Sequence, residues 1–210
     1  MHLTNKNTCA PTPPMGWNSW NCWARDVTQE QILSSARAMV EKGLADHGWS
    51  YINIDDGWQG RRGGRYNAIQ PNKKFPDMAA LTREIHDMGL RVGIYSTPWI
   101  GTYAAHIGSY SDRPDGENEW IEKGLHNENY RYQKPGGNYW EDRCEVWHHG
   151  PYSFVEADVK QWAEWGIDYL KYDWHPLNYY HVREMFDMLR KIDRDIIFSL
   201  SNSAPYGDAP

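Results

Sequence analysis

The sequence predicts an α/β protein, a (β/α)8 TIM barrel of which this chain holds the first five βα units. Short apolar runs typical of buried strands alternate with segments whose apolar residues recur every three or four positions. One strand–helix unit occupies about 35 residues, so eight units would need about 280, near the usual size of such a barrel. The chain has 210 residues. We therefore expect residues 1–210 to form the N-terminal portion of one TIM-barrel domain.

The five predicted strands are short and mostly apolar, as a parallel sheet covered on both faces requires. They comprise residues 15–17, 51–55, 91–95, 168–172 and 195–200. Polar side chains gather where these strands end, namely Asp55, Asp56, Ser96, Asp173 and Ser201. Because α/β proteins place their sites at the carboxyl ends of parallel strands, these residues predict one shared site.

Four helices are predicted between the strands. They comprise residues 28–42, 76–88, 156–165 and 178–192. The first opens on a capping box, in which Thr28 and Gln31 satisfy each other's backbone N–H groups, and it ends at Gly43. Gly89 and Gly166 end the second and third helices in the same way. Helices that follow strands in this order imply right-handed crossovers between parallel strands.

One connection, residues 97–154, is too long for a simple turn. It is an insertion between the third predicted strand and the third predicted helix, and it is rich in Tyr, Trp, Gly and charged residues, with Trp120, Trp140 and Trp147 among them. Connections of this length inside a compact domain are usually functional. We expect it to shape binding subsites for a polymer; the alternative is a lid that only packs on the barrel.

The composition excludes several classes of function. A net charge of −6 and a pI of about 5.8 argue against nucleic-acid binding. No apolar stretch approaches the roughly 20 residues of a membrane span. The N-terminus shows no signal peptide, so no compartment is assigned and a secreted or periplasmic parent is left open. Neither metal-ligand spacing nor a phosphate-binding loop occurs, so no metal or cofactor is expected. Three cysteines without a CxxC pair predict no disulfide framework.

Lys171 and Asp173 form the most specific chemical pattern. They lie two positions apart on a predicted strand, so both side chains point to the same side. An ammonium group nearby favours an ionised carboxylate, which suits a nucleophile or an electrostatic stabiliser. A structural ion pair at the rim of the barrel is an equally weighted alternative.

Asp55 and Asp56 are adjacent carboxylates at a strand end, followed by Gly57 and Trp58. Burying two such groups is unfavourable unless donors satisfy them, and sugar hydroxyls are suitable donors. Trp58 is expected to stack on a sugar face. For Asp56, capping a turn before Gly57 is an equally weighted alternative.

Aromatic residues and histidines give weaker signals. In the stretch 15–21, core packing is expected for Trp20 more than for Trp17. His148 and His149 are expected to face solvent. Among the histidines only His175, just after the predicted nucleophile strand, has a fair claim on the site.

Four motifs together resemble glycoside hydrolase family 27, the α-galactosidases and α-N-acetylgalactosaminidases. They are PPMGWNSWN (13–21), YINIDDGWQ (51–59), FPDMAALTREIHDMGLRVGIYS (75–96) and DVKQWAEWGIDYLKYDW (158–174). The resemblance implies a (β/α)8 barrel that cleaves terminal α-D-galactosides with retention. The four motifs include four of the five predicted strands, and all of them lie outside the 97–154 connection.

The resemblance also implies residue roles. Asp173 matches the nucleophile, and Lys171 matches a lysine that binds sugar hydroxyls. Asp55 and Asp56 match the pair that grips the O4 and O6 hydroxyls. Two aromatic residues complete the subsite: Trp17 matches its tryptophan wall, and Tyr95 matches the tyrosine under the reacting carbon.

This sequence departs from the family pattern at three points. The family's acid/base aspartate and a sugar-binding arginine follow a sixth strand, and the sequence ends at Pro210 before it; we expect a fragment of a longer enzyme or a degenerate one. Ser201 and Ala204 resemble the roomier pocket of the N-acetylgalactosaminidases. Gly57 and residues 174–175 stand where animal enzymes have cysteines.

Three functions follow from these observations. The first is a retaining glycosidase for α-galactosides, or for α-N-acetylgalactosaminides, with Asp173 as nucleophile and a carbohydrate, oligosaccharide or polysaccharide, as partner. The second is a truncated, non-catalytic carbohydrate-binding remnant. The third is a Schiff-base lyase that uses Lys171, against which the neighbouring carboxylate argues because it raises the lysine pKa. Five strands also leave two open sheet edges, which predicts self-association.

Overall fold

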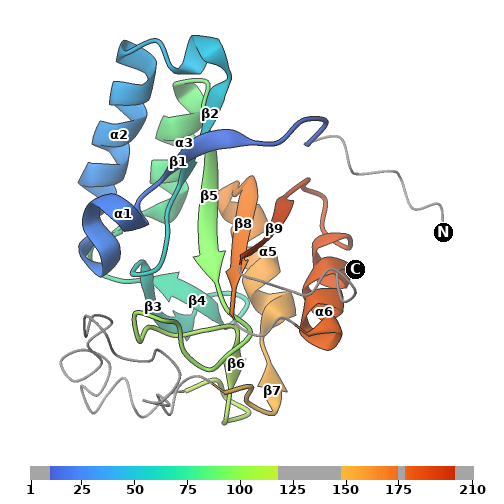
Figure 1. Cartoon of the computed structure of the whole chain (residues 1–210). Helices are drawn as coiled ribbons and strands as arrows, with labels where there is room; N and C mark the ends of the chain where they lie inside the picture. The colour runs from blue at the N-terminus through green and yellow to red at the C-terminus, as the bar shows by residue number, and fades with distance from the viewer. Residues whose placement is uncertain (1–9, 118–147, 175–177, 202–210) are drawn as a thin grey trace, which may run out of the picture.

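The computed structural model describes residues 10–117, 148–174 and 178–201. Its main feature is a five-stranded sheet in which all neighbouring strands are parallel. In spatial order the strands are β1 (Met15–Asn18), β2 (Trp49–Asn53), β5 (Arg91–Ser96), β8 (Tyr169–Asp173) and β9 (Ile197–Ser201). Spatial order therefore follows chain order, as in the first part of a TIM barrel, and the curled sheet confirms the predicted fold class (Figure 1).

One main helix follows each of the first four strands of this sheet. These helices are α2 (Gln29–Glu41), α3 (Met78–Asp87), α5 (Val155–Trp165) and α6 (Tyr179–Leu189). The capping box of α2 is present: the Gln31 N–H donates to Thr28 Oγ1, and the Thr28 N–H donates to Gln31 Oε1. Short helical turns also occur at α1 (Trp20–Trp23), η1 (Ala24–Asp26) and η2 (Ala45–His47).

The core lies between the sheet and these helices. Fully buried side chains from the strands and the helices meet there, among them Ile52, Val92, Leu170, Ile32, Leu81 and Trp162. On β8 these core positions alternate with Lys171 and Asp173, which therefore point to the opposite face of the sheet. That face is the interior of the curled sheet.

Two small antiparallel pairs lie beyond the carboxyl ends of the main strands (Figure 1). One is the hairpin β3 (Gln59–Gly63) and β4 (Ala68–Pro71), and the other pairs β6 (Tyr110–Ser111) with β7 (Tyr152–Ser153). The sequence analysis predicted neither. The hairpin is tied to α5 by a buried ion pair between Arg62 and Asp158, with 2.7 Å between Nη1 and Oδ1. It covers the end of the sheet at which Asp55 and Asp56 lie.

Some predictions concern residues outside the described part of the chain. Trp120, Trp140 and Trp147 are among them, as are Cys9 and Cys144. Cys22 is described, and it is exposed with a free thiol. Across the described ranges, the helices all fall short of the length and apolar character that a membrane crossing demands.

Candidate active site

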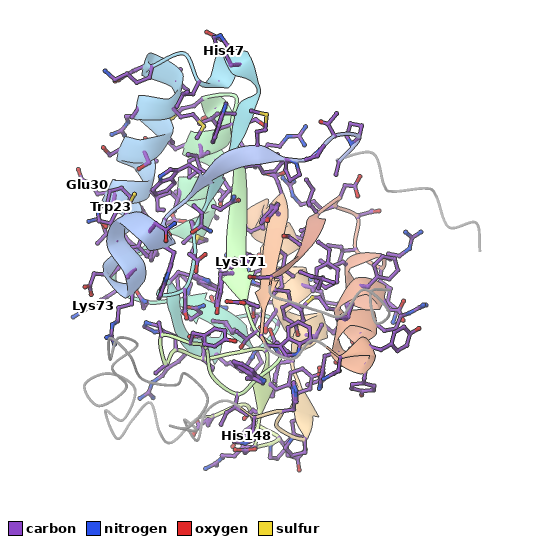
Figure 2. The ribbon with its side chains drawn as sticks, viewed as in Figure 1. Trp23, Glu30, His47, Lys73, His148 and Lys171 are labelled. Atoms are coloured by element: carbon purple, nitrogen blue, oxygen red, sulfur yellow. The ribbon has the colours of Figure 1, made fainter. Side chains whose placement is uncertain are left out.

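The interior face of the sheet brings the predicted polar residues together. Asp55 and Asp56 follow β2, while four further side chains come from the neighbouring strands: Tyr95, Lys171, Asp173 and Ser201. The register explains this convergence, because Tyr95 is paired with Lys171, and Asp173 with Ser201. Figure 2 shows Lys171 near the centre of the molecule, whereas His47 and His148 lie at its opposite ends.

Asp55 is the carboxylate that Lys171 contacts. Lys171 Nζ lies 2.8 Å from Asp55 Oδ2, and Asn18 Nδ2 donates to the same oxygen at 2.7 Å. The other oxygen, Oδ1, accepts the backbone N–H of Asp56 at 2.8 Å. Asp55 is 2% exposed, so its charge is held by a cation and two further donors inside the protein.

Two of the partners of Asp173 are hydroxyl groups from the neighbouring strands. Tyr95 Oη donates to Asp173 Oδ2 at 3.1 Å, and the Ser201 side chain is a second hydrogen-bond partner. Burial raises the pKa of Asp173 above its ordinary value, while Lys171, Tyr95 and Ser201 pull it back down. The prediction that Lys171 keeps this carboxylate ionised is thus right in direction, but burial outweighs the lysine.

Asp56 is held by the segment that follows β5. Thr102 Oγ1 donates to Asp56 Oδ1 at 2.7 Å, and the Ala104 N–H donates to Oδ2 at 2.7 Å. Asp56 is 1% exposed, and burial raises its pKa to about 7 although both hydrogen bonds oppose that shift. The Gly57 N–H donates to the side chain of Gln59 instead, so the carboxylate of Asp56 does not cap that turn.

Lys171 and Tyr95 are held in their protonated forms. Burial alone would lower the pKa of Lys171, but the carboxylates of Asp55 and Asp173 raise it above its ordinary value. Burial, with Asp173 next, raises the pKa of Tyr95 well above that of free tyrosine. The site therefore presents one ammonium group and one phenol hydroxyl to its carboxylates.

Two tryptophans predicted for the site lie elsewhere. Trp58 is completely buried, and its Nε1–H donates to the backbone oxygen of Tyr95. Its ring packs edge-on against Trp165 of α5, with 5.9 Å between the ring centroids. It therefore has no face on which a sugar could stack. Trp17 is paired with Ile52, a core residue, and its ring packs against Trp23 on the helix side of the sheet. Its expected role as a subsite wall is not met by this geometry.

Trp20, for which core packing was expected, is linked to Asp55 through Asn18. Its backbone N–H donates to Asn18 Oδ1 at 2.9 Å, and the same Asn18 side chain donates to Asp55. Trp20 is partly exposed, whereas its neighbours Trp17 and Trp23 are partly buried and pack against the core. The sequence signal was the alternation of strand residues, which places Asn18 and Trp17 on opposite faces.

Two other predicted residues, His175 and Ala204, lie outside the described ranges. Within residues 10–117, 148–174 and 178–201, three or more His, Cys, Asp or Glu side chains do not gather in a way that could hold a metal ion. The side chains that the structure brings together at this site are carboxylates, an ammonium group and hydroxyls.

Sequence comparison decides the family. The sequence model of a family described as "Alpha galactosidase A" matches residues 12–124, which include β1, β2 and β5 and the two aspartates after β2. The chain belongs to this α-galactosidase family, glycoside hydrolase family 27. A curated relative, the "Probable alpha-galactosidase" of Dictyostelium discoideum, is 30% identical over 201 residues. The alignment covers 92% of this chain and 41% of the relative.

Solved α-galactosidase structures share the fold. α-Galactosidase I from Mortierella vinacea superposes with a TM-score of 0.69 at 30% identity, covering 95% of this chain and 42% of that one. An α-galactosidase from Saccharomyces cerevisiae, solved with raffinose, gives a TM-score of 0.66 at 26% identity, covering 91% and 35%. The chain thus spans about two fifths of the length of such family members.

Proposed function

We propose that this chain carries the nucleophile and part of the sugar subsite of a retaining glycoside hydrolase that acts on terminal α-D-galactosides. The observation that carries the proposal is the placement of Asp173 beside Tyr95 on the face that also holds the Lys171–Asp55 pair. Family membership adds that relatives of this sequence are named α-galactosidases. One of them was solved with raffinose, and we infer a substrate of the same galactoside class.

The proposed first step is attack by Asp173 on the anomeric carbon. A new bond forms between a carboxylate oxygen of Asp173 and that carbon, while the bond to the leaving-group oxygen breaks with its electron pair. The Tyr95 hydroxyl donates to Asp173 Oδ2 and so orients the carboxylate for attack. Water then cleaves the glycosyl ester and releases galactose with its original anomeric configuration.

The second carboxyl group that such a mechanism needs is the acid/base. By resemblance it follows a sixth strand, so none of the residues of this chain is assigned to it. Asp56 has a pKa of about 7, but both of its oxygens are occupied by the segment after β5. We therefore assign Asp56 to binding rather than to proton transfer.

The sugar-binding part of the proposal rests on a positively charged hydrogen-bond donor and on negatively charged acceptors. Lys171 supplies N–H donors to sugar oxygens, while Asp55 and Asp56 retain acceptor lone pairs for the O4 and O6 hydroxyls. Trp20 replaces Trp17 as the proposed aromatic wall. The Ser201 hydroxyl is hydrogen-bonded to Asp173, so we assign it to holding that carboxylate.

The lyase alternative is not supported by the charges around Lys171. A Schiff-base lysine must be deprotonated to attack a carbonyl group. The carboxylates of Asp55 and Asp173 raise the pKa of Lys171, so its ammonium form is favoured. The remnant alternative has no specific observation in its favour, and the experiment below distinguishes it from catalysis.

The decisive experiment uses an activated substrate, 2,4-dinitrophenyl α-D-galactoside. Dinitrophenolate leaves without protonation, so the first step needs the nucleophile but not the acid. We expect up to one equivalent of dinitrophenolate per chain, followed by slow turnover, and a mass increase of one galactosyl group on the peptide that contains Asp173. Trapping by acid quench and mass spectrometry would locate the ester.

The controls separate chemistry from binding. Asp173→Ala should release no burst, whereas Asp187→Ala, an exposed carboxylate on α6, should behave as the wild type. Three outcomes would each reject Asp173 as the nucleophile of this chain. They are labelling of another carboxylate, an unchanged burst in Asp173→Ala, and a wild-type chain that is not labelled at any pH.

A further inference from the structure

The segment that follows β5 reaches across to Asp56 and takes both of its carboxylate oxygens. Thr102 Oγ1 and the Ala104 N–H each donate at 2.7 Å, one to each oxygen. The three residues from Thr102 to Ala104 are 46 to 48 positions away from Asp56 in the sequence. A contact between such distant segments, made at the predicted sugar site, points to a role for the segment in that site.

The Thr102 hydroxyl is fixed on both sides. It is fully buried, and its oxygen accepts the N–H of His106 at 3.0 Å while its proton is directed at Asp56. The backbone around it is also closed, because the Thr102 N–H donates to the His106 oxygen at 2.8 Å. Thr102 is therefore a rigid donor aimed at one carboxylate oxygen.

Charged neighbours make this donor important for the ionisation of Asp56. Burial is the main cause that raises its pKa to about 7, and the carboxylates of Asp55 and Asp173 add to the rise. The ammonium groups of Lys171 and Lys74 interact electrostatically with Asp56, and so does the phenol of the buried Tyr95. The Ala104 N–H and the Thr102 hydroxyl are the hydrogen bonds that oppose the rise.

We propose that Thr102 is a positioning residue for sugar recognition, which holds Asp56 in place and keeps its carboxylate in the ionised, hydrogen-bond-accepting form. The proposal rests on the proposed function for its link to a sugar. A carboxylate has about four acceptor positions, and the segment occupies two, so two remain for sugar hydroxyls. When Asp56 is protonated it loses acceptor capacity, so sugar binding should weaken at low pH.

The first test reads the ionisation of Asp56 without any sugar. In the full chain labelled with 13C at the aspartate carboxyl, NMR titration should give Asp56 a pKa near 7 in the wild type, with the Asp56→Asn variant identifying its signal. Thr102→Val keeps the shape and removes the hydroxyl donor. A hydrogen bond to a charged group is strong enough to move this pKa up by about one unit. Thr102→Ser retains a hydroxyl and should restore the wild-type value.

A matched control comes from the same segment. The buried Thr97 hydroxyl donates to the Gly101 oxygen at 2.8 Å and not to Asp56. Thr97→Val should leave the Asp56 titration near its wild-type midpoint. An equal shift in both valine variants would mean that loosening of the segment, not the lost hydroxyl, is the cause. That result, or an unchanged titration in Thr102→Val with a folded spectrum, would overturn the proposal.

The second test links the contact to the sugar. Galactose affinity, measured by calorimetry, should fall as the pH is lowered, and the midpoint of this fall should equal the pKa of Asp56. In Thr102→Val this limb should move up with the pKa, so affinity at pH 7 should fall about fivefold, because a one-unit rise reduces the ionised fraction by that factor. A pKa shift without a matching affinity shift would overturn the positioning role. If the pKa shift is present but galactose binds neither the wild type nor any variant, the proposed sugar site is rejected and the electrostatic contact is supported.

Discussion

At the scale of single residues, Asp56 couples folding to pH. Its pKa in the folded chain is about 7, against 3.8 in the unfolded chain. Between these values the folded state binds more protons at this group, so stability falls as the pH rises from about 4 to 7. A difference of about three units corresponds to a loss on the order of 4 kcal/mol. The loss is complete above pH 7 and absent below pH 4.

Asp56→Asn should remove this pH dependence, because an amide does not titrate. We expect the change in unfolding free energy from pH 4.5 to pH 7.5, measured by urea denaturation, to be more positive in the variant than in the wild type, because the stability that Asp56 loses over this range is no longer lost. Other carboxyl groups, such as Glu156 beside Lys160, shift stability in the opposite direction, but they are the same in both proteins. Parallel stability curves for wild type and variant would contradict the prediction.

Lys171 influences the ionisation of Asp173, the proposed nucleophile. It contacts Asp55 directly, and it is the largest of the influences that lower the pKa of Asp173. Lys171→Met should therefore raise the pKa of Asp173 further and reduce its ionised fraction at a given pH. We expect the acid limb of the dinitrophenolate burst to move to higher pH.

The matched control for this prediction is Lys160→Met on α5. Lys160 is exposed and pairs with Glu156 one helical turn away, so its loss should leave the burst profile unchanged. Equal profiles for Lys171→Met and the wild type would show that the lysine does not tune the nucleophile. Removing Lys171 also leaves Asp55 without its cation, so thermal stability should fall in the same variant.

Residue identities were predictable where strand alternation alone decided them. Lys171 and Asp173 lie on one face because they are two apart, and the structure confirms that placement. Trp17 was assigned to the site by resemblance, whereas its register with β2 pairs it with the core residue Ile52. Trp58 follows the end of a strand, where the alternation of strand residues no longer applies. The sequence therefore does not predict whether its ring points toward the core or toward the site.

At the scale of elements, Arg62 and Asp158 connect the β3–β4 hairpin to α5. Their side chains are 2% and 0% exposed, and Asp158 Oδ1 also accepts the Ile69 N–H at 2.9 Å. Arg62 Nη2 further donates to the Gly108 oxygen at 2.6 Å, so the segment that carries Thr102 depends on the same contact. The pair therefore holds three elements against one end of the sheet.

Arg62→Met should destabilise the chain by about 3–5 kcal/mol, because it leaves the buried Asp158 carboxylate without its cation. Urea denaturation measures this loss. The double variant Arg62→Met/Asp158→Asn should recover part of it, since the Asn oxygen can still accept the Ile69 N–H. Arg183→Met, which breaks an exposed pair with Asp187 on α6, should change stability little. A loss for Arg62→Met no greater than that for Arg183→Met would contradict the prediction.

Helices and main strands were predictable because their signals are local. The Thr28 capping box and the glycines after α2, α3 and α5 lie within a few positions of the ends that they define. The β3–β4 hairpin was not predictable in this way. Its sequence is polar and glycine-rich, without apolar alternation, and its anchor Asp158 lies 96 residues away from Arg62. Only the folded chain brings that partner to it.

At the scale of the whole molecule, the site draws on four of the five strands, so it exists only once the sheet has formed. Asp55 after β2 meets Lys171 of β8, and Tyr95 of β5 meets Asp173. The first contact joins residues that are 116 positions apart in the sequence, and the second joins residues that are 78 positions apart. Formation of the site should therefore coincide with cooperative folding of the sheet.

The same sheet has two outer strands in the described part of the chain, β1 and β9. The Ile197 N–H donates to Asp168 on the β8 side, and N–H groups alternate along a strand. The N–H groups of Phe198 and Leu200 therefore point away from β8. Such outward-facing groups form a template on which another strand can pair. We predict that this chain self-associates through β9, with sedimentation velocity showing larger species as concentration increases.

Leu200→Pro tests this edge directly. Proline removes an outward N–H but none of the hydrogen bonds to β8, and edge strands tolerate it for that reason. Leu200→Ala is the matched control, because it loses the same side-chain packing and keeps the N–H. We expect Leu200→Pro to shift the chain toward monomer, while Leu200→Ala associates like the wild type. A wild-type chain that stays monomeric up to millimolar concentration would contradict the predicted self-association. Equal association of both variants would show that β9 is not the contact, and the same substitution would then be made on β1.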